Sequence, residues 1–464
     1  MATSNQKPHI TEYNYFLNTY LCPLLSLKWE SVFSPTNKPI DERQKGKFIY
    51  QEENNTICFT NKEYVVFELK YNKKLGEDTI KIADSIIDCF SYVSKFSITT
   101  GKKQANYYSD VHQKENYKMA IQKGICDWII GGRNAEVERL FEILENWSVQ
   151  TYEGKKVTFG FIIDPNKEST FDTKYGDWND FLQDDFSAVL TDCVNSVIEL
   201  DKNCNFCGYL SITENNTVEQ YTLQKYLPLR FSNVIEKYVS GERVGIFLLN
   251  NGDIILSKKG RAIFVKRNLK WLNLEYDAFE KAFGEYFNKT SIAPGLLEEI
   301  FASMLDVSFS HSGGIIAVVN DESELTKYGE NELPILSESD YLLSESSLEQ
   351  IYNNLTTIKK YPVREIKKRI LKRNVIQSLV KNKTFTELDR KLRCELISLD
   401  GACILNTQGQ VCSFGAIIKN DSGSSGGGRG AAAKKLSHNG FAIKISTDGY
   451  IELYINENKE YAIK

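Results

Sequence analysis

The chain has 464 residues, 42% hydrophobic and 25% charged, which is a globular composition with enough length for two or three domains. Its formal net charge of -4 argues against nucleic-acid binding by bulk charge, and no run of about 18 apolar residues predicts a membrane span. The first residues lack the apolar core of a signal peptide, and ten cysteines at irregular spacing indicate reduced thiols, so we expect a cytoplasmic protein.

Strands and helices are mixed from the beginning of the chain, which predicts an α/β fold throughout. Alternating apolar residues predict strands, and apolar residues three or four positions apart predict helices. In the first part of the chain these are strands at residues 48–50, 56–59, 64–71 and 156–163 and helices at residues 78–96 and 135–147. An Asp-Pro turn signal follows the last of these strands.

The remaining chain continues the same mixture. Helices are predicted at residues 178–200, 276–287, 296–305, 348–355 and 363–380, and strands at residues 208–213, 244–249, 254–258, 262–266 and 315–320. The Asn-Asn-Gly-Asp sequence at residues 250–253 is a hairpin turn signal between two of these strands. The last strand is fully apolar, as expected for a strand buried in a sheet.

These elements divide the chain into three predicted domains. Residues 1–165 form an α/β region without a recognisable function, and residues 166–290 form a second α/β region with a β-meander. Residues 291–464 form a third domain that ends in two strands, at residues 441–446 and 450–455. No internal repeat with a fixed period is visible in the sequence.

The third domain contains an acidic turn, Asp400-Gly401-Ala402, after a short apolar segment at residues 395–398 that reads as a strand. An isolated Asp-Gly pair is most often a simple turn. A carboxylate at a strand end can instead hold a divalent metal ion beside a phosphate group. The residues that follow decide between these two interpretations in favour of a binding site.

A run of glycine and serine at residues 422–429 ends in Arg429 and precedes a predicted helix at residues 431–436. Such runs are often flexible linkers. This run is short, however, and lies between that helix and a predicted strand at residues 415–419. A helix N-terminus presents free N–H groups to an anion, and an arginine can bind phosphate through two hydrogen bonds. The pattern therefore favours a phosphate-binding loop.

Together these motifs resemble the diadenylate cyclase (DAC) domain, and most closely the version in DNA-integrity scanning proteins. That family has Asp-Gly-Ala, then Gly-Thr-Arg-His-Arg-Ala-Ala before its last helix, and a terminal Ile-x-Leu-Tyr strand, which here is Ile451-Glu-Leu-Tyr454. The likeness covers residues 292–464 and implies a mixed sheet flanked by helices. It also implies a cytoplasmic enzyme that joins two ATP molecules into cyclic di-AMP, a signalling nucleotide in bacteria.

The resemblance also implies the roles of individual residues. Asp400 would be the catalytic residue and would bind Mg²⁺ or Mn²⁺, which activates a ribose 3′-hydroxyl. The implied nucleotide-binding residues are Gly401, Ala402, Ser425, Gly426, Gly427, Gly428, Arg429 and Ser437. One domain holds one nucleotide, so a productive enzyme would be a homodimer or a higher homo-oligomer formed through this domain.

The chain departs from the family at one point, because Arg-His-Arg is replaced by Arg429-Gly430-Ala431. This loss removes positive charge and hydrogen-bond donors from the phosphate site, although Lys434 or Lys435 could substitute one turn later. The alternative is therefore a DAC-like sensor that binds a nucleotide signal without converting it and regulates a partner. The retained Asp400 favours the cyclase, since a pure binding domain has less need of a metal-holding acid.

Three other patterns have simpler explanations. The many lysines and arginines of residues 359–383 indicate the solvated face of a helix rather than a nucleic-acid surface. The pair Cys204 and Cys207 lacks the second pair that a structural zinc site needs. Glu68 and Lys70 have the Glu-x-Lys spacing of some nucleases, but no further acid stands nearby to complete a metal site.

Overall fold

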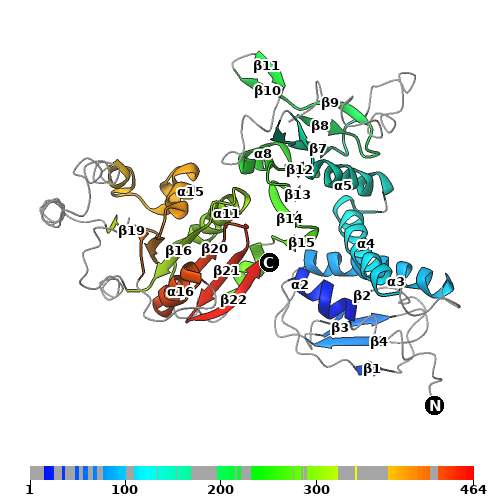
Figure 1. Cartoon of the computed structure of the whole chain (residues 1–464), viewed down its shortest axis with the longest axis horizontal. Coiled ribbons are helices and arrows are strands. Elements are labelled where there is room, and N and C mark those ends of the chain that lie inside the picture. Colours follow the sequence, from blue (N-terminus) through cyan, green and yellow to red (C-terminus); the bar gives the residue numbers. More distant parts are fainter. Residues whose placement is uncertain are drawn as a thin grey trace, which may run out of the picture. The chain divides into compact units, whose positions relative to one another are not determined.

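The computed structural model describes residues 15–25, 34–36, 48–51, 56–60, 66–70, 77–100, 109–132, 134–152, 154–168, 196–214, 217–220, 231–274, 276–283, 286, 290–321, 340–341, 375–418 and 427–463. The fold is α/β, as predicted, and divides into two compact units (Figure 1). The first unit comprises Met1–Lys225 and Asn233–Glu275, and the second comprises Tyr226–Ser232 and Tyr276–Lys464. Within the described part of the chain, no helix is long and apolar enough to cross a membrane.

The first unit begins with an antiparallel sheet of four strands in the order β1-β4-β3-β2. Its strands are β1 (Ser34–Thr36), β2 (Phe48–Gln51), β3 (Thr56–Thr60) and β4 (Val66–Lys70). The three predicted strands in this part are confirmed as β2, β3 and β4. Glu68 and Lys70 both lie on β4.

A larger sheet follows in the same unit, with the strand order β15-β14-β13-β12-β7-β8-β9. Its strands are β7 (Phe159–Ile163), β8 (Val197–Leu200), β9 (Phe206–Tyr209), β12 (Val244–Leu248), β13 (Ile254–Lys258), β14 (Arg261–Arg267) and β15 (Lys270–Asn273). Only β7 and β8 are parallel neighbours. Strands from both sides of the expected domain boundary at residue 165 belong to this sheet, so the two regions that the sequence separates share one core.

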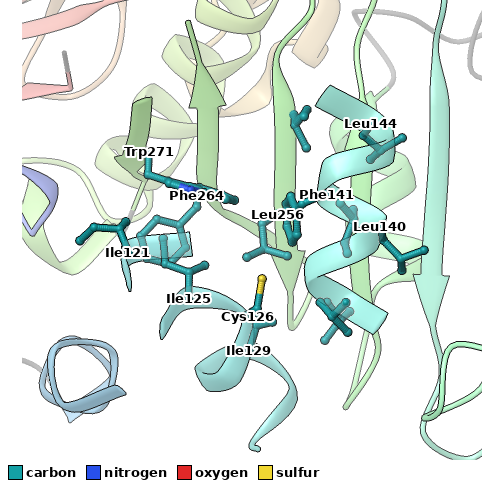
Figure 2. Packing of buried hydrophobic residues seen from close by; sticks show 14 of the residues in the cluster. Ile121, Ile125, Cys126, Ile129, Leu140, Phe141, Leu144, Leu256, Phe264 and Trp271 are labelled. Atoms are coloured by element: carbon teal, nitrogen blue, oxygen red, sulfur yellow. The ribbon is translucent and has the colours of Figure 1, made fainter. Parts of the chain in front are cut away.

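Three helices contribute to the hydrophobic core of the first unit together with strands of the large sheet and residues 16–25: α3 (Glu77–Thr100), α4 (Ser109–Ile130) and α5 (Ala135–Ser148). The Asn134 side chain accepts a hydrogen bond from the Glu136 N–H at 2.9 Å and so caps α5, which matches the predicted helix at residues 135–147. Figure 2 shows α4 and α5 packed against the sheet, where Phe141 meets Trp271 edge to face with ring centres 5.1 Å apart. The spacing of the apolar residues therefore decides which helix faces are buried.

The second unit contains a mixed sheet in the order β17-β19-β18-β16-β20-β21-β22. Its strands are β16 (Gly314–Val319), β17 (Asp340–Tyr341), β18 (Ala402–Asn406), β19 (Val411–Ala416), β20 (Gly440–Ile445), β21 (Ile451–Ile455) and β22 (Asn458–Ile463). Again only one pair of neighbours, β16 and β18, is parallel.

Helices cover both faces of this sheet (Figure 1). On one face, Ala432, Ala433 and Leu436 of α16 (Gly427–Leu436) form a small apolar cluster with β16, β18 and β20. On the other face, α9 (Tyr276–Ala282) and α11 (Leu296–Phe309) pack through aromatic rings. The helix α15 (Arg390–Ser398) contacts α11 and is tied to it by an ion pair of 2.5 Å between Arg390 and Asp306.

Six strands of each large sheet have the same topology, although the sequence showed no repeat. In each, a helix (α5 or α11) precedes a central strand, a parallel neighbour and then an antiparallel strand follow, and a second helix leads into an antiparallel meander. The strands β15 and β17, at opposite ends of this arrangement, have no counterpart among the described residues of the other sheet. That second helix is α8 (Phe231–Tyr238) in the first unit and α16 in the second. The strands β7, β8, β9, β12, β13 and β14 thus correspond to β16, β18, β19, β20, β21 and β22.

The correspondence extends to the irregular features of the backbone. The loops 249–253 and 446–450 both close with two hydrogen bonds of 2.9 Å, from the first N–H to the fifth carbonyl and from the fourth N–H to the first carbonyl. The following strand pair shifts register after Leu256 in one sheet and after Leu453 in the other. Asp201 and Asn406 each accept hydrogen bonds from the N–H groups two and four residues later. The second unit thus repeats the backbone design of the first with different side chains.

The structure corrects two predicted elements near the acidic turn. Residues 395–398, which read as a strand, are the end of helix α15, because Asp389 caps this helix through the Lys391 N–H at 2.9 Å. The helix predicted to begin at residue 431 begins at Gly427 instead. The predicted strand at residues 415–419 overlaps with β19, at Val411–Ala416, only in its first two residues, and residues 417 and 418 are not in a strand. Most of the basic helix expected at residues 363–380 and the whole helix expected at 348–355 lie outside the described residues. The helix expected at residues 178–200 lies outside them as far as residue 195, and its last four residues form the strand β8 instead, because they pair with β7 and β9 in the large sheet.

Candidate functional site

A pocket of about 590 Å³ lies at one edge of the second unit's sheet. This edge is formed by the beginnings of β16 and β18 and by the ends of β19 and β20. The pocket is lined by Ile315, Asp400, Gly401, Ala416, Ile417, Ile418, Gly427, Gly428, Arg429, Ala432, Lys444, Ser446 and Thr447. The acidic turn and the Gly-Arg segment that the sequence singled out therefore meet in one cavity.

Asp400 lies in the short connection between α15 and β18, so it precedes a strand rather than ending one. Its side chain is exposed, and no hydrogen bond or ion pair to another described residue holds its carboxylate. A carboxylate without a protein partner keeps its full capacity to accept hydrogen bonds or to ligate a cation. The structure thus leaves Asp400 available to a ligand in the pocket.

Gly401 has a conformational reason to be glycine. Its φ angle is +114°, and a Cβ atom at this position would lie 2.4 Å from the carbonyl carbon of Gly415 on the neighbouring strand. Both the left-handed backbone and the close approach of β19 exclude a side chain. Gly401 therefore sets the direction in which the chain enters β18 and, with it, the position of Asp400.

Arg429 lies in the first turn of α16 and is half-buried. Its guanidinium reaches the turn before β16, where a Cβ atom on Gly313 would lie 2.7 Å from Nη1 of Arg429 and 3.1 Å from Cγ2 of Thr447. Gly313 thus leaves room for the arginine. A guanidinium beside the N-terminal turn of a helix is a favourable arrangement for binding an anion, because both attract negative charge.

Lys444 is a second cationic residue of the pocket, and the sequence analysis missed it. Its Nζ lies 3.1 Å from Oε2 of Glu452 on the neighbouring strand β21. The same carboxylate is 2.7 Å from Nζ of Lys459 and accepts a 2.9 Å hydrogen bond from the Tyr454 hydroxyl. Burial, together with this hydrogen bond and the charge of Glu452, raises the pKa of Tyr454 to about 12. Tyr454 therefore remains a neutral donor to Glu452 over the physiological pH range.

No pattern in the sequence alone marks Lys444 as a site residue, but its place on β20 explains why it lies in the pocket. Ala442 and Lys444 lie two residues apart on β20, and side chains two apart share a face of a sheet. Ala442 belongs to the apolar cluster under α16, so the lysine lies on the face that the helix covers. A charged residue on a covered face is unusual without a functional or pairing reason.

Two other predicted site residues that the structure describes, Ala402 and Ser437, do not line the pocket. Ala402 is buried in the core of the sheet. The hydroxyl of Ser437 donates to the Lys434 carbonyl at 2.7 Å and accepts from the Glu457 N–H at 3.0 Å, so it joins α16 to the turn after β21. Lys434 and Lys435 are likewise absent from the pocket lining. Ser425 and Gly426 lie outside the described residues.

Among the described residues that line the pocket, Asp400 is the one carboxylate that could ligate a metal ion. Among the described residues, no group of three or more His, Cys, Asp or Glu side chains could hold a metal ion, and this includes Cys204 and Cys207. Mg²⁺ commonly binds through one or two carboxylates together with phosphate oxygens of the substrate. Asp400 therefore fits a metal that arrives with a nucleotide, and it does not fit a permanent metal centre.

Comparison of the chain with protein-family models and with curated proteins found no match. Evidence for a function therefore comes from the residues of the pocket themselves.

Proposed function

We propose that the second unit binds a nucleoside triphosphate in the pocket of Asp400 and Arg429 and acts as a nucleotidyl cyclase of the diadenylate cyclase type. The observation that carries this proposal is the meeting of the two sequence motifs in one cavity. Neither side chain has a hydrogen bond or ion pair to another described residue, so both are free to meet a ligand. A pocket of this volume is large enough for a nucleotide-sized ligand.

The proposed chemistry needs no covalent enzyme intermediate. The 3′-oxygen of one nucleotide forms a bond to the α-phosphorus of the other, the bond to pyrophosphate breaks, and the hydroxyl proton is released. A second, reciprocal transfer closes the ring. Arg429 and the N-terminal turn of α16 would hold the phosphates, and Asp400 would ligate Mg²⁺ or Mn²⁺, which supplies charge stabilisation. Because one pocket holds one nucleotide, the reaction requires a second copy of the chain, most simply in a two-fold homodimer.

Arg429→Ala is expected to weaken ATP binding by about 1–3 kcal/mol, the usual cost of losing a charge-assisted hydrogen bond. Calorimetric titration of the purified protein with ATP and Mg²⁺ measures this change. Lys434→Ala is the matched control, because Lys434 is an exposed cation on the same helix outside the pocket lining. Equal affinity in wild type and Arg429→Ala would remove the proposed site.

A second candidate function is that of a sensor that binds the nucleotide without converting it. It is favoured by the residues after Arg429, since Gly430 and Ala431 supply no cation or side-chain donor where the DAC family has His and Arg. Losing one donor to a transition state commonly costs about 3–4 kcal/mol. In that case the nucleotide would regulate a partner of the protein.

Asp400→Asn is expected to keep the fold and ATP binding but to abolish metal-dependent turnover, because the amide is a poorer metal ligand. Incubation with each NTP and Mg²⁺ or Mn²⁺, followed by mass spectrometry of the products, measures the turnover. Absence of any dinucleotide from a wild-type protein that binds ATP would leave the sensor as the function. Full activity of Asp400→Asn would refute the role given to Asp400.

A further inference from the structure

The repeated topology allows a residue-by-residue comparison at the pocket. In the second unit, Lys444 of β20 pairs directly with Ile315 of β16 on one side and with Glu452 of β21 on the other. The residue at the same register position in the first unit is Phe247 of β12, which pairs with Gly160 of β7 and with Ile255 of β13. The charged pair of the second unit, Lys444 and Glu452, thus occupies the position of the apolar pair Phe247 and Ile255 in the first unit.

The first unit shows that the sheet can form without a charged residue at this position. Phe247 and Ile255 are both fully buried. The phenyl ring covers Gly160 so closely that a Cβ atom there would lie 2.7 Å from Cδ1 of Phe247. The same backbone register, turns and register shift therefore form when an apolar side chain fills the space.

In the second unit the residues at the same position are charged, and burying them costs free energy of folding. The side chains of Lys444 and Glu452 are only 18% and 7% exposed. Withdrawing two such charges from water is expensive, and apolar replacements of similar volume are often neutral or stabilising. The first unit has the same strand register without these charges, so folding does not require them. The cavity that Lys444 lines offers a functional explanation for them.

We propose that Lys444 binds phosphate oxygens of the pocket's ligand together with Arg429, and that Glu452 is the positioning residue that holds its ammonium group. This inference rests on the proposed function, since it assigns a further residue to the same site. A Cβ atom on Gly430 would lie 3.8 Å from Nζ of Lys444, so the ammonium lies beside the turn of α16 that follows Arg429. An ammonium group has three donors, and Glu452 takes one of them.

The position of this lysine suits the altered motif of the chain. The helix residues after Arg429, Gly430 and Ala431, supply no cation, whereas Lys444 brings one to the same place from the neighbouring strand. A small residue at position 430 also leaves the ammonium accessible from the helix side. Positive charge in the pocket is thus supplied by a strand residue in addition to the helix.

The test uses the full-length chain and two ligands, ATP with Mg²⁺ and inorganic tripolyphosphate, each titrated by calorimetry. Lys444→Met should weaken the binding of both ligands at least about tenfold, as expected for loss of a charge-assisted contact. Lys444→Arg should retain most of the affinity, because it keeps the charge. Lys459→Met is the matched control, since Lys459 pairs with the same carboxylate but does not line the pocket.

Glu452→Gln tests the positioning role. Alone it should weaken the binding of both ligands, and combined with Lys444→Met it should add little further loss, because it acts only through the lysine. A full additional loss in the double variant would overturn the positioning role. Circular dichroism and thermal unfolding of each variant show whether the fold is kept.

The outcomes separate this inference from the proposed function. If Lys444→Met folds and binds ATP as wild type does while Arg429→Ala does not, Lys444 has no role in binding and the nucleotide site stands. If wild type binds tripolyphosphate through Lys444 but does not bind ATP, the anion site stands and the nucleotide proposal fails. If wild type binds neither ligand, both are refuted.

Discussion

Replacing Arg267 by methionine is expected to destabilise the first unit by about 3–5 kcal/mol, the usual cost of leaving a buried charge without its partner. Arg267 and Asp253 are 2% and 3% exposed, and Nη2 of the arginine lies 2.6 Å from Oδ2 of the aspartate. The arginine Nε contacts both carboxylate oxygens, at 3.1 and 3.0 Å. This pair joins the loop before β13 to the end of β14, so replacing the arginine removes the positive charge that neutralises the buried carboxylate of Asp253.

Denaturant unfolding followed by circular dichroism measures this change, and hydrogen exchange assigns it to the strands of the first unit. Arg139→Met is the control, since Arg139 forms a more exposed pair with Glu136 at 3.7 Å and should cost less than about 1 kcal/mol. The double replacement Arg267→Met with Asp253→Leu should recover part of the loss, because it removes both charges. Wild-type stability of the single variant would mean that water reaches the carboxylate.

Gly401→Ala is expected to destabilise the second unit by about 2 kcal/mol or more. The φ angle of +114° is unfavourable for alanine, and its Cβ would lie 2.4 Å from the backbone of Gly415. Since the three atoms nearest to the new methyl group are all main-chain atoms of Gly415 and Ala416, the collision cannot be relieved by a side-chain rotation. The chain must move at the entry to β18, and Asp400 moves with it.

Gly428→Ala is the matched control for stability. Apart from its chain neighbours and its own helix backbone, a Cβ atom at this position meets no atom of the described residues within 4 Å, and the residue lies within helix α16. Alanine there should be neutral or should stabilise the helix by up to about 1 kcal/mol. Equal thermal unfolding of Gly401→Ala and wild type would show that β19 can move away at little cost.

Local sequence patterns were sufficient to predict the elements in which apolar spacing or turn residues also determine how the element packs. The apolar spacing in residues 135–147 predicted α5, and the Asn-Asn-Gly-Asp sequence predicted the hairpin between β12 and β13. The acidic turn and the Gly-Arg segment were both singled out as candidate site residues, and both line the pocket. The helix α15 was missed at residues 395–398, because a short apolar segment has no period of its own and the cap at Asp389 decided the structure.

By itself the sequence determined the α/β class, the positions of the strongly periodic elements and two of the segments that meet in the pocket. The tertiary structure alone decided that Lys444 belongs to this pocket and that six strands of each large sheet share one topology. Both depend on which strands pair and in what register, which is set by contacts between residues far apart in the chain. The repeat is not visible in the sequence because the backbone register can be kept while the side chains at equivalent positions change, as Phe247 and Lys444 do.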